Sequence, residues 1–329
     1  AANVGNDHRL GAHEAPPAIV SVFLGEQLDD VLEQLLSTGN ATHSLRGHKL
    51  HTGVKTLPDF TKDATDRNRT SPFAFTGNKF EFRMVGSSDS VSSANVVLNT
   101  IVAEAFKEAA DELEKAEDFD LAVHDLIKEY ATDHQKIVFN GNGYAPEWEK
   151  EAKRRGLPIL PSMVDAIPAL TTEKAVKLFE SFDVFSRAEL ESRAEIKYEI
   201  YSKAINIEAK TMIDMATKQI IPAVIKYTTV LAESINQVKA VGPIDVSVQM
   251  DLLKKASKLL KEVNSTMNKL SKLVDQIETH PEGRDRAVFC REKLVPAMEK
   301  LREPVDELEM LVDKDMWPMP SYGDLVFEP

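Results

Sequence analysis

The sequence lacks several features that mark particular protein classes. It has one cysteine, Cys290, in 329 residues, so no disulfide can form within the chain, as is typical of a reducing compartment. No stretch approaches about 18 consecutive apolar residues, the length of a membrane-spanning helix. The first residues have neither the basic end nor the apolar segment of a secretory signal. We therefore expect a cytoplasmic location and no membrane partner.

Positive charge is also scarce. Lys and Arg number 40 against 53 Asp and Glu, the net charge is −13, and the cations are not gathered into runs. A nucleic-acid partner is not expected from this balance. The content of 43% hydrophobic and 28% charged residues is that of an ordinary globular protein, long enough for one large or two medium domains.

Two regimes divide the chain. Residues 1 to about 92 are mixed, and we expect a helix from about Pro17 to Ser37, a small hairpin around Lys49 to Thr56, and a strand near Phe80. The connection between the helix and the strand carries three histidines: His43, His48 and His51. They are compatible with a metal site, which would need further ligands, or with a polar surface loop, which we favour.

From Ser92 onward the patterns are helical. We expect helices from Ala94 to Ala116 and from Ser186 to about Ala240, the second kinked at Pro222. The next helix, about Ile244 to Thr279, repeats apolar residues in alternating steps of three and four, which is a heptad seam. The seam residues are Leu253, Ala256, Leu260, Val263, Met267, Leu270, Val274 and Ile277. A last helix is interrupted at Pro296 and Pro304, and the long helices predict an antiparallel bundle. Cys290 lies in a helical pattern and is interpreted as core filling.

One stretch of the mixed region carries chemistry: Asn78-Lys79-Phe80-Glu81-Phe82-Arg83. In a strand, Phe80 and Phe82 face one side, and Lys79, Glu81 and Arg83 face the other. A carboxylate between two cations suits a site that holds a metal and an anion. The structural alternative is an edge strand with a solvated charged face.

The surrounding motifs resemble glutamine synthetase, and specifically its long type III branch. The resemblance is carried by an arginine and a Glu-Ala-Pro flap, an Asn-Arg loop, the charged strand, and two later tracts. These are Arg9 with His13-Glu14-Ala15-Pro16-Pro17, Asn68-Arg69-Thr70-Ser71-Pro72-Phe73, Asn78 to Arg83, Asn142-Gly143-Tyr144-Ala145-Pro146-Glu147-Trp148, and Trp317-Pro318-Met319-Pro320-Ser321-Tyr322-Gly323.

The resemblance implies an α+β fold: the C-terminal part of the glutamine synthetase catalytic domain over residues 1–118, then a helical C-terminal domain with long antiparallel helices over residues 119–329. The family's glycine-rich, histidine-bearing segment and further metal-binding glutamates precede the flap and are not in this sequence. We therefore expect the chain to be an incomplete portion of the enzyme and inactive alone. The longer enzyme is expected to be a homo-oligomer of stacked hexameric rings.

The implied reaction is ATP-dependent ligation of ammonia to L-glutamate, giving L-glutamine through γ-glutamyl phosphate, with Mg²⁺ or Mn²⁺. By resemblance, Glu81 is the metal ligand. Arg83 is catalytic and also binds the substrate. Glu14, in the flap, is the second catalytic residue. Arg9 binds the substrate carboxylate, and Arg69 and Lys79 bind ATP. The alternative hypothesis is a helical interaction module without enzymatic activity.

Two positions depart from the commoner branch of the family. Ala74 stands where that branch has an arginine, so one phosphate contact must come from elsewhere. His13 replaces the residue usual before Glu-Ala-Pro. Each assigned side chain also has a structural alternative: Glu14 as an exposed turn residue, Arg69 paired with Asp66, and Lys79 as a solvated strand residue.

Overall fold

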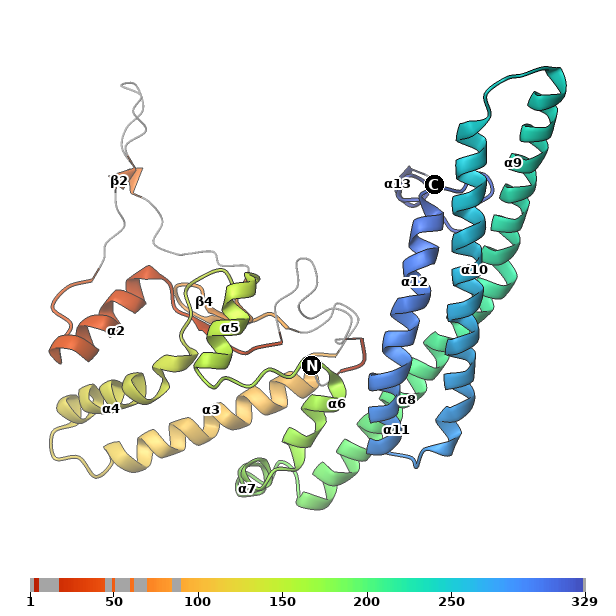
Figure 1. Ribbon diagram of the computed structural model, residues 1–329. Helices are drawn as coiled ribbons and strands as arrows, with labels where there is room; N and C mark the ends of the chain where they lie inside the picture. Colours follow the sequence, from red (N-terminus) through yellow and green to blue (C-terminus); the bar gives the residue numbers. More distant parts are fainter. Residues whose placement is uncertain are drawn as a thin grey trace. The chain divides into compact units, whose positions relative to one another are not determined.

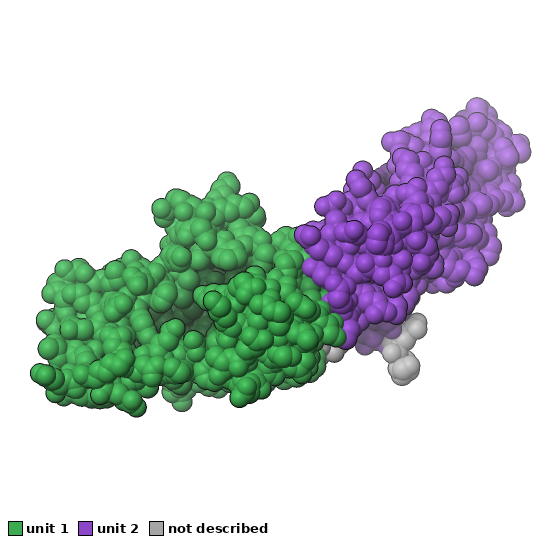
Figure 2. Space-filling view, turned by 90° about the horizontal axis from the view of Figure 1, so that it is seen from below, with its two compact units in different colours: residues 1–194 green, residues 195–329 purple. Residues whose placement is uncertain are grey.

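The described residues are mostly helical and contain a three-stranded sheet and a two-stranded sheet (Figure 1). The structure, a computed structural model, describes residues 3–5, 18–44, 49–50, 60–61, 70–84 and 90–327. Two compact units divide it, residues 1–194 and residues 195–329 (Figure 2). A few strands followed by long helices were expected, and at this level the expectation is confirmed. The expected domain boundary between residues 118 and 119 was inferred from the family resemblance and not from compactness, and it stays a prediction.

The sheet of the first unit has three strands in the order β1-β4-β5. These are β1 (Val22–Phe23), β4 (Phe73–Phe75) and β5 (Phe80–Phe82). The β1 strand runs parallel to β4, and β4 pairs antiparallel with β5. The strand expected near Phe80 is therefore confirmed as the edge of this sheet.

The expected helix from about Pro17 is wrong at its N-terminal end. β1 occupies part of that range, and the helix α2 spans Glu26–Thr38. Ile19, Val20 and Val22 are β-branched and favour a strand. Gly25 then adopts φ 81°, a conformation that few other residues tolerate, and it ends the strand before the helix begins.

An antiparallel strand pair is found where the hairpin was expected to begin. β2 (Lys49–Leu50) pairs antiparallel with β3 (Phe60–Thr61), so the second strand lies later in the chain than expected. Residues 51–59 lie outside the described residues.

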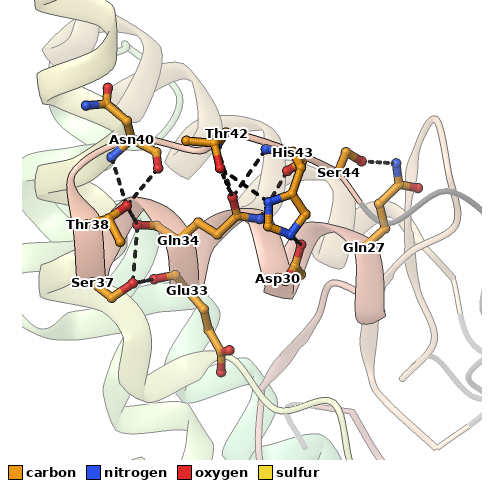
Figure 3. Close-up of polar contacts among 10 residues, drawn as sticks. All are labelled: Gln27, Asp30, Glu33, Gln34, Ser37, Thr38, Asn40, Thr42, His43 and Ser44. Atoms are coloured by element: carbon orange, nitrogen blue, oxygen red, sulfur yellow. Dashed lines mark hydrogen bonds and ion pairs between the residues drawn. The ribbon is translucent and has the colours of Figure 1, made fainter.

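The chain beyond α2 folds back along that helix (Figure 3). The Gln34 Oε1 atom accepts hydrogen bonds from the backbone N–H of Thr42 at 2.9 Å and of His43 at 3.3 Å, and Gln34 Nε2 donates to the His43 carbonyl at 3.0 Å. Gln27 Nε2 donates to Ser44 Oγ at 2.7 Å. These bonds hold residues 40–44 against the exposed side of the helix.

The first unit continues with helices whose caps follow the sequence. The helices and 3₁₀ turns are α3 (Ser92–Leu113), α4 (Phe119–His134), η1 (Gln135–Ile137), α5 (Pro146–Arg154), α6 (Met163–Ala166), η2 (Ile167–Thr171) and α7 (Glu173–Ser181). Asp118, Ser162 and Thr172 each accept a backbone N–H at the start of a helix, as N-cap residues do. The core gathers around Trp148, which is 2% exposed and stacks on Phe139.

The second unit consists of long helices, as the heptad pattern predicts. The elements are α8 (Arg187–Met215), which begins in the first unit, η3 (Ala216–Ile220), α9 (Ile221–Val241), α10 (Ser247–Gln276), η4 (Ile277–Thr279), α11 (Arg284–Phe289), η5 (Cys290–Leu294), α12 (Val295–Glu309) and α13 (Tyr322–Phe327). The helix α10 packs against both α9 and α12 (Figure 1). Every second seam residue of α10 is buried: Ala256, Val263, Leu270 and Ile277. No helix in the described ranges is long and apolar enough to cross a bilayer.

Two prolines within the long helices follow π turns. Pro222 is the second residue after η3, and the intervening Ile221 donates its N–H to the Ala216 carbonyl. Pro296 is likewise the second residue after η5, and the intervening Val295 donates its N–H to the Cys290 carbonyl. A proline has no N–H and its ring clashes with the carbonyl four residues earlier, which favours a wider turn at that point. Each wide turn shifts the hydrogen-bond register at that point. The disturbance predicted at Pro222 thus takes the form of a π turn. The interruption expected at Pro304 is wrong, since α12 continues through that residue to Glu309.

Cys290 lies in the second of these turns and is fully buried, which confirms its interpretation as core filling. Burial raises the pKa of its thiol to about 11 from an ordinary 9.0. The folded protein therefore keeps the thiol neutral over a pH range in which the unfolded chain releases the proton. Over that range the unfolded chain binds fewer protons than the folded one, so stability falls as pH rises.

We predict that alkaline pH destabilises the wild type more than a Cys290→Ala variant. Between about pH 8 and pH 11 the excess loss in free energy of unfolding should be about 2 kcal/mol, because a pKa shift of one unit corresponds to about 1.4 kcal/mol and partial hydration reduces the total. Lysine and tyrosine titration is common to both proteins and cancels. Denaturant unfolding of both across this range measures the difference, and parallel pH profiles would contradict the prediction.

Candidate functional site

The charged side of β5 is the candidate site. Glu81 lies directly opposite Ala74 in the antiparallel register of β4 and β5. Lys79 and Arg83, two residues away on either side, both approach its carboxylate: Lys79 Nζ lies 3.8 Å from Oε1 and Arg83 Nη2 lies 2.7 Å from Oε2. The expectation that these three side chains share one face is confirmed.

Arg83 binds one oxygen of Glu81 with two donors. Its Nε lies 3.1 Å and its Nη2 lies 2.7 Å from the same atom, Oε2. The hydrogen bond from Arg83 lowers the pKa of the Glu81 carboxyl below its ordinary value, and the charges of Arg83 and Lys79 add to that direction. Glu81 is thus ionised at neutral pH. Its Oε1 atom has the looser contact with Lys79, and the Glu81 side chain is 39% exposed.

The opposite face of the two strands is aromatic. The Phe73 ring stacks on Phe80 with centroids 5.1 Å apart and meets Phe82 edge-on at 6.2 Å, and Phe75 lies 5.3 Å from Phe80. This cluster holds β5 against β4 with the charged residues directed away from it. The alternation seen in the sequence is therefore the alternation of the structure.

Ala74 is fully buried beside the site. The side chain opposite Glu81 is thus a methyl group, which carries no charge. Within the described residues, the cations that approach Glu81 are Lys79 and Arg83, which flank β5 on either side, and none comes from β4.

A divalent metal fits the described residues only in part. No group of three or more His, Cys, Asp or Glu side chains in the described ranges lies close enough to hold an ion. Glu81 offers one ionised carboxylate, which is a ligand that Mg²⁺ and Mn²⁺ accept, but these ions need several oxygens. The other ligands must come from outside the described part of the chain.

His43 belongs to the segment of residues 40–44 that is hydrogen-bonded along α2. Its Nδ1 lies 3.3 Å from Thr42 Oγ1 and its Nε2 lies 3.9 Å from Asp30 Oδ2, and its side chain is 63% exposed. These contacts support the polar-surface interpretation for this histidine. His48 and His51 lie outside the described residues.

Three predicted site residues lie outside the described residues: Arg9, Glu14 and Arg69. The structure does describe Thr70, which follows Arg69. The Gly143 N–H donates to Thr70 Oγ1 at 2.9 Å, and a Cβ added at Gly143 would lie 2.3 Å from the Thr70 carbonyl oxygen. Only glycine permits this approach. Gly143 therefore holds Thr70, the residue that follows Arg69 in the sequence.

Asn140 anchors the sheet from the same later segment. Its Oδ1 accepts hydrogen bonds from the backbone of Leu24 at 3.0 Å and of Gly25 at 3.2 Å, and the Phe139 N–H donates to the Val22 carbonyl at 2.9 Å. From the sequence, Asn142 and Gly143 were noted as part of a tract that carries the family resemblance. The cluster of Asn and Gly was a signal of close backbone approach, but its partners are 70 or more residues distant.

We predict that the low pKa of Glu81 depends on Arg83. In an Arg83→Met variant the Glu81 pKa should rise toward its ordinary 4.5, because the dominant hydrogen bond is lost. A Lys79→Met variant is the matched control and should raise it less, since Lys79 is farther from the carboxylate. Carbon NMR titration of the labelled Glu81 carboxyl measures both. A pKa unchanged by loss of Arg83 would refute the pairing.

Comparison with known proteins bears on the whole chain. Residues 122–239 match the family model described as the glutamine synthetase C-terminal domain. A type-3 glutamine synthetase from Dictyostelium discoideum is 39% identical over 98% of this chain and 45% of its own length. Glutamine synthetases from Bacteroides fragilis and Butyrivibrio fibrisolvens are 34% and 35% identical, each over 99% of this chain and over 46% and 47% of their own lengths.

The chain spans less than half the length of the curated relatives it matches. The similarity nevertheless runs along nearly all of this sequence, through the strand of Glu81 and Arg83 as well as the helices. The chain is therefore similar to glutamine synthetases, and to a type-3 glutamine synthetase in particular, over nearly all of its own length.

Proposed function

We propose that the chain forms the C-terminal portion of an enzyme that ligates ammonia to L-glutamate with ATP, giving L-glutamine through γ-glutamyl phosphate. The observation that carries this proposal is the ionised Glu81 held by Arg83 on β5, in a chain similar to glutamine synthetases over nearly its whole length. The family generally uses ATP and divalent metals, and Mg²⁺ or Mn²⁺ is proposed here.

The reaction requires that a poor leaving group, the γ-carboxylate oxygen of glutamate, be converted to phosphate. Phosphoryl transfer proceeds when the transferring group is positioned and its negative charge is balanced by cations. A divalent ion, when bound, neutralises the phosphate oxygens. The protein must supply the remaining cations and the ligands that hold them in place.

The residues of β5 divide these tasks. Glu81 would give its Oε1 atom to the metal, because Arg83 already occupies Oε2. Arg83 would keep Glu81 ionised and turn its guanidinium toward the substrate and its reacting phosphoryl group. Lys79 would face the nucleotide from the outer side of the same strand, where it is 67% exposed.

Three further roles belong to residues outside the described part of the chain. Arg9 would hold the substrate carboxylate, and Arg69 would contact the ATP phosphates. Glu14 in the flap would help deprotonate ammonium and cover the acyl phosphate, which excludes water from the intermediate. The hydrogen bond between Gly143 and Thr70 supports the role of Arg69, because it fixes the residue next to it.

The domain division belongs to the same proposal. Residues 1–118 would form the C-terminal part of the catalytic domain and residues 119–329 the helical C-terminal domain, with long antiparallel helices. The start of the family-model match at residue 122 supports the boundary. A cytoplasmic location is also proposed, and the unpaired, buried Cys290 supports it.

Assembly is the second function proposed for the helices. Ile196, Ile200 and Ile207 follow one face of α8 and are 50%, 48% and 65% exposed. An exposed isoleucine row of this spacing favours contact with another protein surface. This supports a homo-oligomer, which we propose to be one of stacked hexameric rings. The same exposed row is also compatible with the alternative hypothesis, a helical interaction module that acts only in assembly.

The test is a Glu81→Ala substitution in the full-length enzyme. Metal-dependent glutamine formation should fall by about a hundredfold or more, the usual cost of removing a group that organises transition-state charge. Glu112→Ala, on the exposed side of α3, is the matched control and should keep normal turnover. Normal turnover in Glu81→Ala would remove the central assignment. The 329-residue chain alone should form no glutamine, and measurable product would contradict its proposed incompleteness.

A further inference from the structure

A cavity of about 280 Å³ lies within the second unit. Its walls come from the turn between α8 and α9, from α12, and from the segment after α12, which contributes Trp317 and Met319. The proposed ligase chemistry uses none of these groups. Trp317 and Met319 belong to the C-terminal tract that the sequence singled out, so this tract has a structural place but no assigned role.

The π turn η3 forms one wall of the cavity. Met215 precedes this turn, and Ala216 and Ile220 lie within it, and all three line the space. A π turn widens a helix by one residue and moves side chains off the ordinary helical face, and such turns are frequent at functional sites. Pro222 favours a wide turn at this point, because it has no N–H and its ring clashes with the carbonyl four residues earlier. The cavity is therefore bounded by a turn that the sequence favours.

Trp317 brings a buried donor to this region. Its indole Nε1 is buried and has no hydrogen-bond partner among the described residues. A buried donor without an acceptor costs about 1–3 kcal/mol, and native structures rarely leave one so. A ligand that carries an oxygen acceptor would satisfy it.

The rim of the cavity is acidic. Arg302 donates to Asp306 at 3.2 Å, four residues along α12, and so these two charges offset each other. Glu309, one turn further on the same side of the helix, joins no ion pair in the described part of the chain. One negative charge is thus left at the mouth. The thioethers of Met212 and Met215 and the indole of Trp317 provide a polarizable wall that tolerates a nearby cation.

We infer that this cavity binds a small amphiphilic cation. Its apolar body would lie among the methionine side chains, an uncharged oxygen would accept the Trp317 N–H, and its ammonium would face Glu309. The volume is near the lower end for small-molecule sites, which suits one aromatic or branched aliphatic group. This inference is independent of the proposed ligase activity.

The probe for the test is 4-fluoro-L-phenylalaninamide, which carries a ring, a carbonyl oxygen and an ammonium. Fluorine NMR titration of the probe with the 329-residue chain measures affinity. Trp317→Phe keeps a ring but removes the donor, and it should weaken binding about tenfold, as expected for loss of one hydrogen bond of about 1.4 kcal/mol. Glu309→Gln removes the charge and should weaken binding severalfold.

Two variants serve as matched controls. Trp148→Phe makes the same change at the other tryptophan, in the first unit, and Glu299→Gln makes the same charge change on an exposed position of α12. Both should bind the probe as the wild type does, with unchanged helical circular dichroism showing that each variant is folded. Absence of binding to the wild type would overturn the inference. So would binding that Trp317→Phe and Glu309→Gln leave unchanged.

Discussion

The antiparallel pairing of β4 with β5 is the constraint on which the site depends. It places Phe73 beside Phe82 and Ala74 beside Glu81, so one side of the pair becomes aromatic and the other charged. A shift of one residue in this register would exchange the two sides. The stacked rings resist that shift, because it would break the contacts of Phe73 with Phe80 and Phe82. The position of Glu81 therefore follows from packing on the opposite face.

Arg83 gives the carboxylate a definite state. Both of its donors meet a single oxygen, which keeps Glu81 ionised and leaves the other oxygen oriented toward Lys79 and solvent. A metal ligand that is already ionised and already oriented loses little freedom when the ion arrives. The buried methyl group of Ala74 keeps β4 from contributing another charge. The charges of the described part of the site thus come from β5 and its two flanking residues.

The segment after α4 connects this sheet to the helical half of the chain. Asn140 binds the end of β1, and Gly143 binds the residue next to the Arg69 position. Both lie inside the stretch that matches the glutamine synthetase C-terminal domain. The compact first unit accordingly extends to residue 194, although the boundary proposed from ancestry lies at residue 118. Residues of the proposed helical domain would then help to hold the sheet of the proposed catalytic domain in place.

Local patterns predicted some of this structure well. The two-residue alternation around Glu81 identified its face, and the heptad steps identified Ala256, Val263, Leu270 and Ile277 as core, because both patterns repeat within a few residues. β1 was missed, since Val22 becomes a strand by pairing with Phe73, far along the chain. The partner of Gly143 was missed for the same reason. The proline at position 222 signalled a disturbance, but its form depends on how the neighbouring helices pack.

The most direct measurement of the central claim is the position of a bound metal. In crystals of the full-length enzyme grown with Mn²⁺ and ATP, anomalous scattering should show a manganese ion about 2.0–2.3 Å from Glu81 Oε1, the distance of a direct carboxylate ligand. Arg83 should remain on Oε2. A manganese site with no contact to Glu81, and with that carboxylate still paired only to Arg83 and Lys79, would contradict the account.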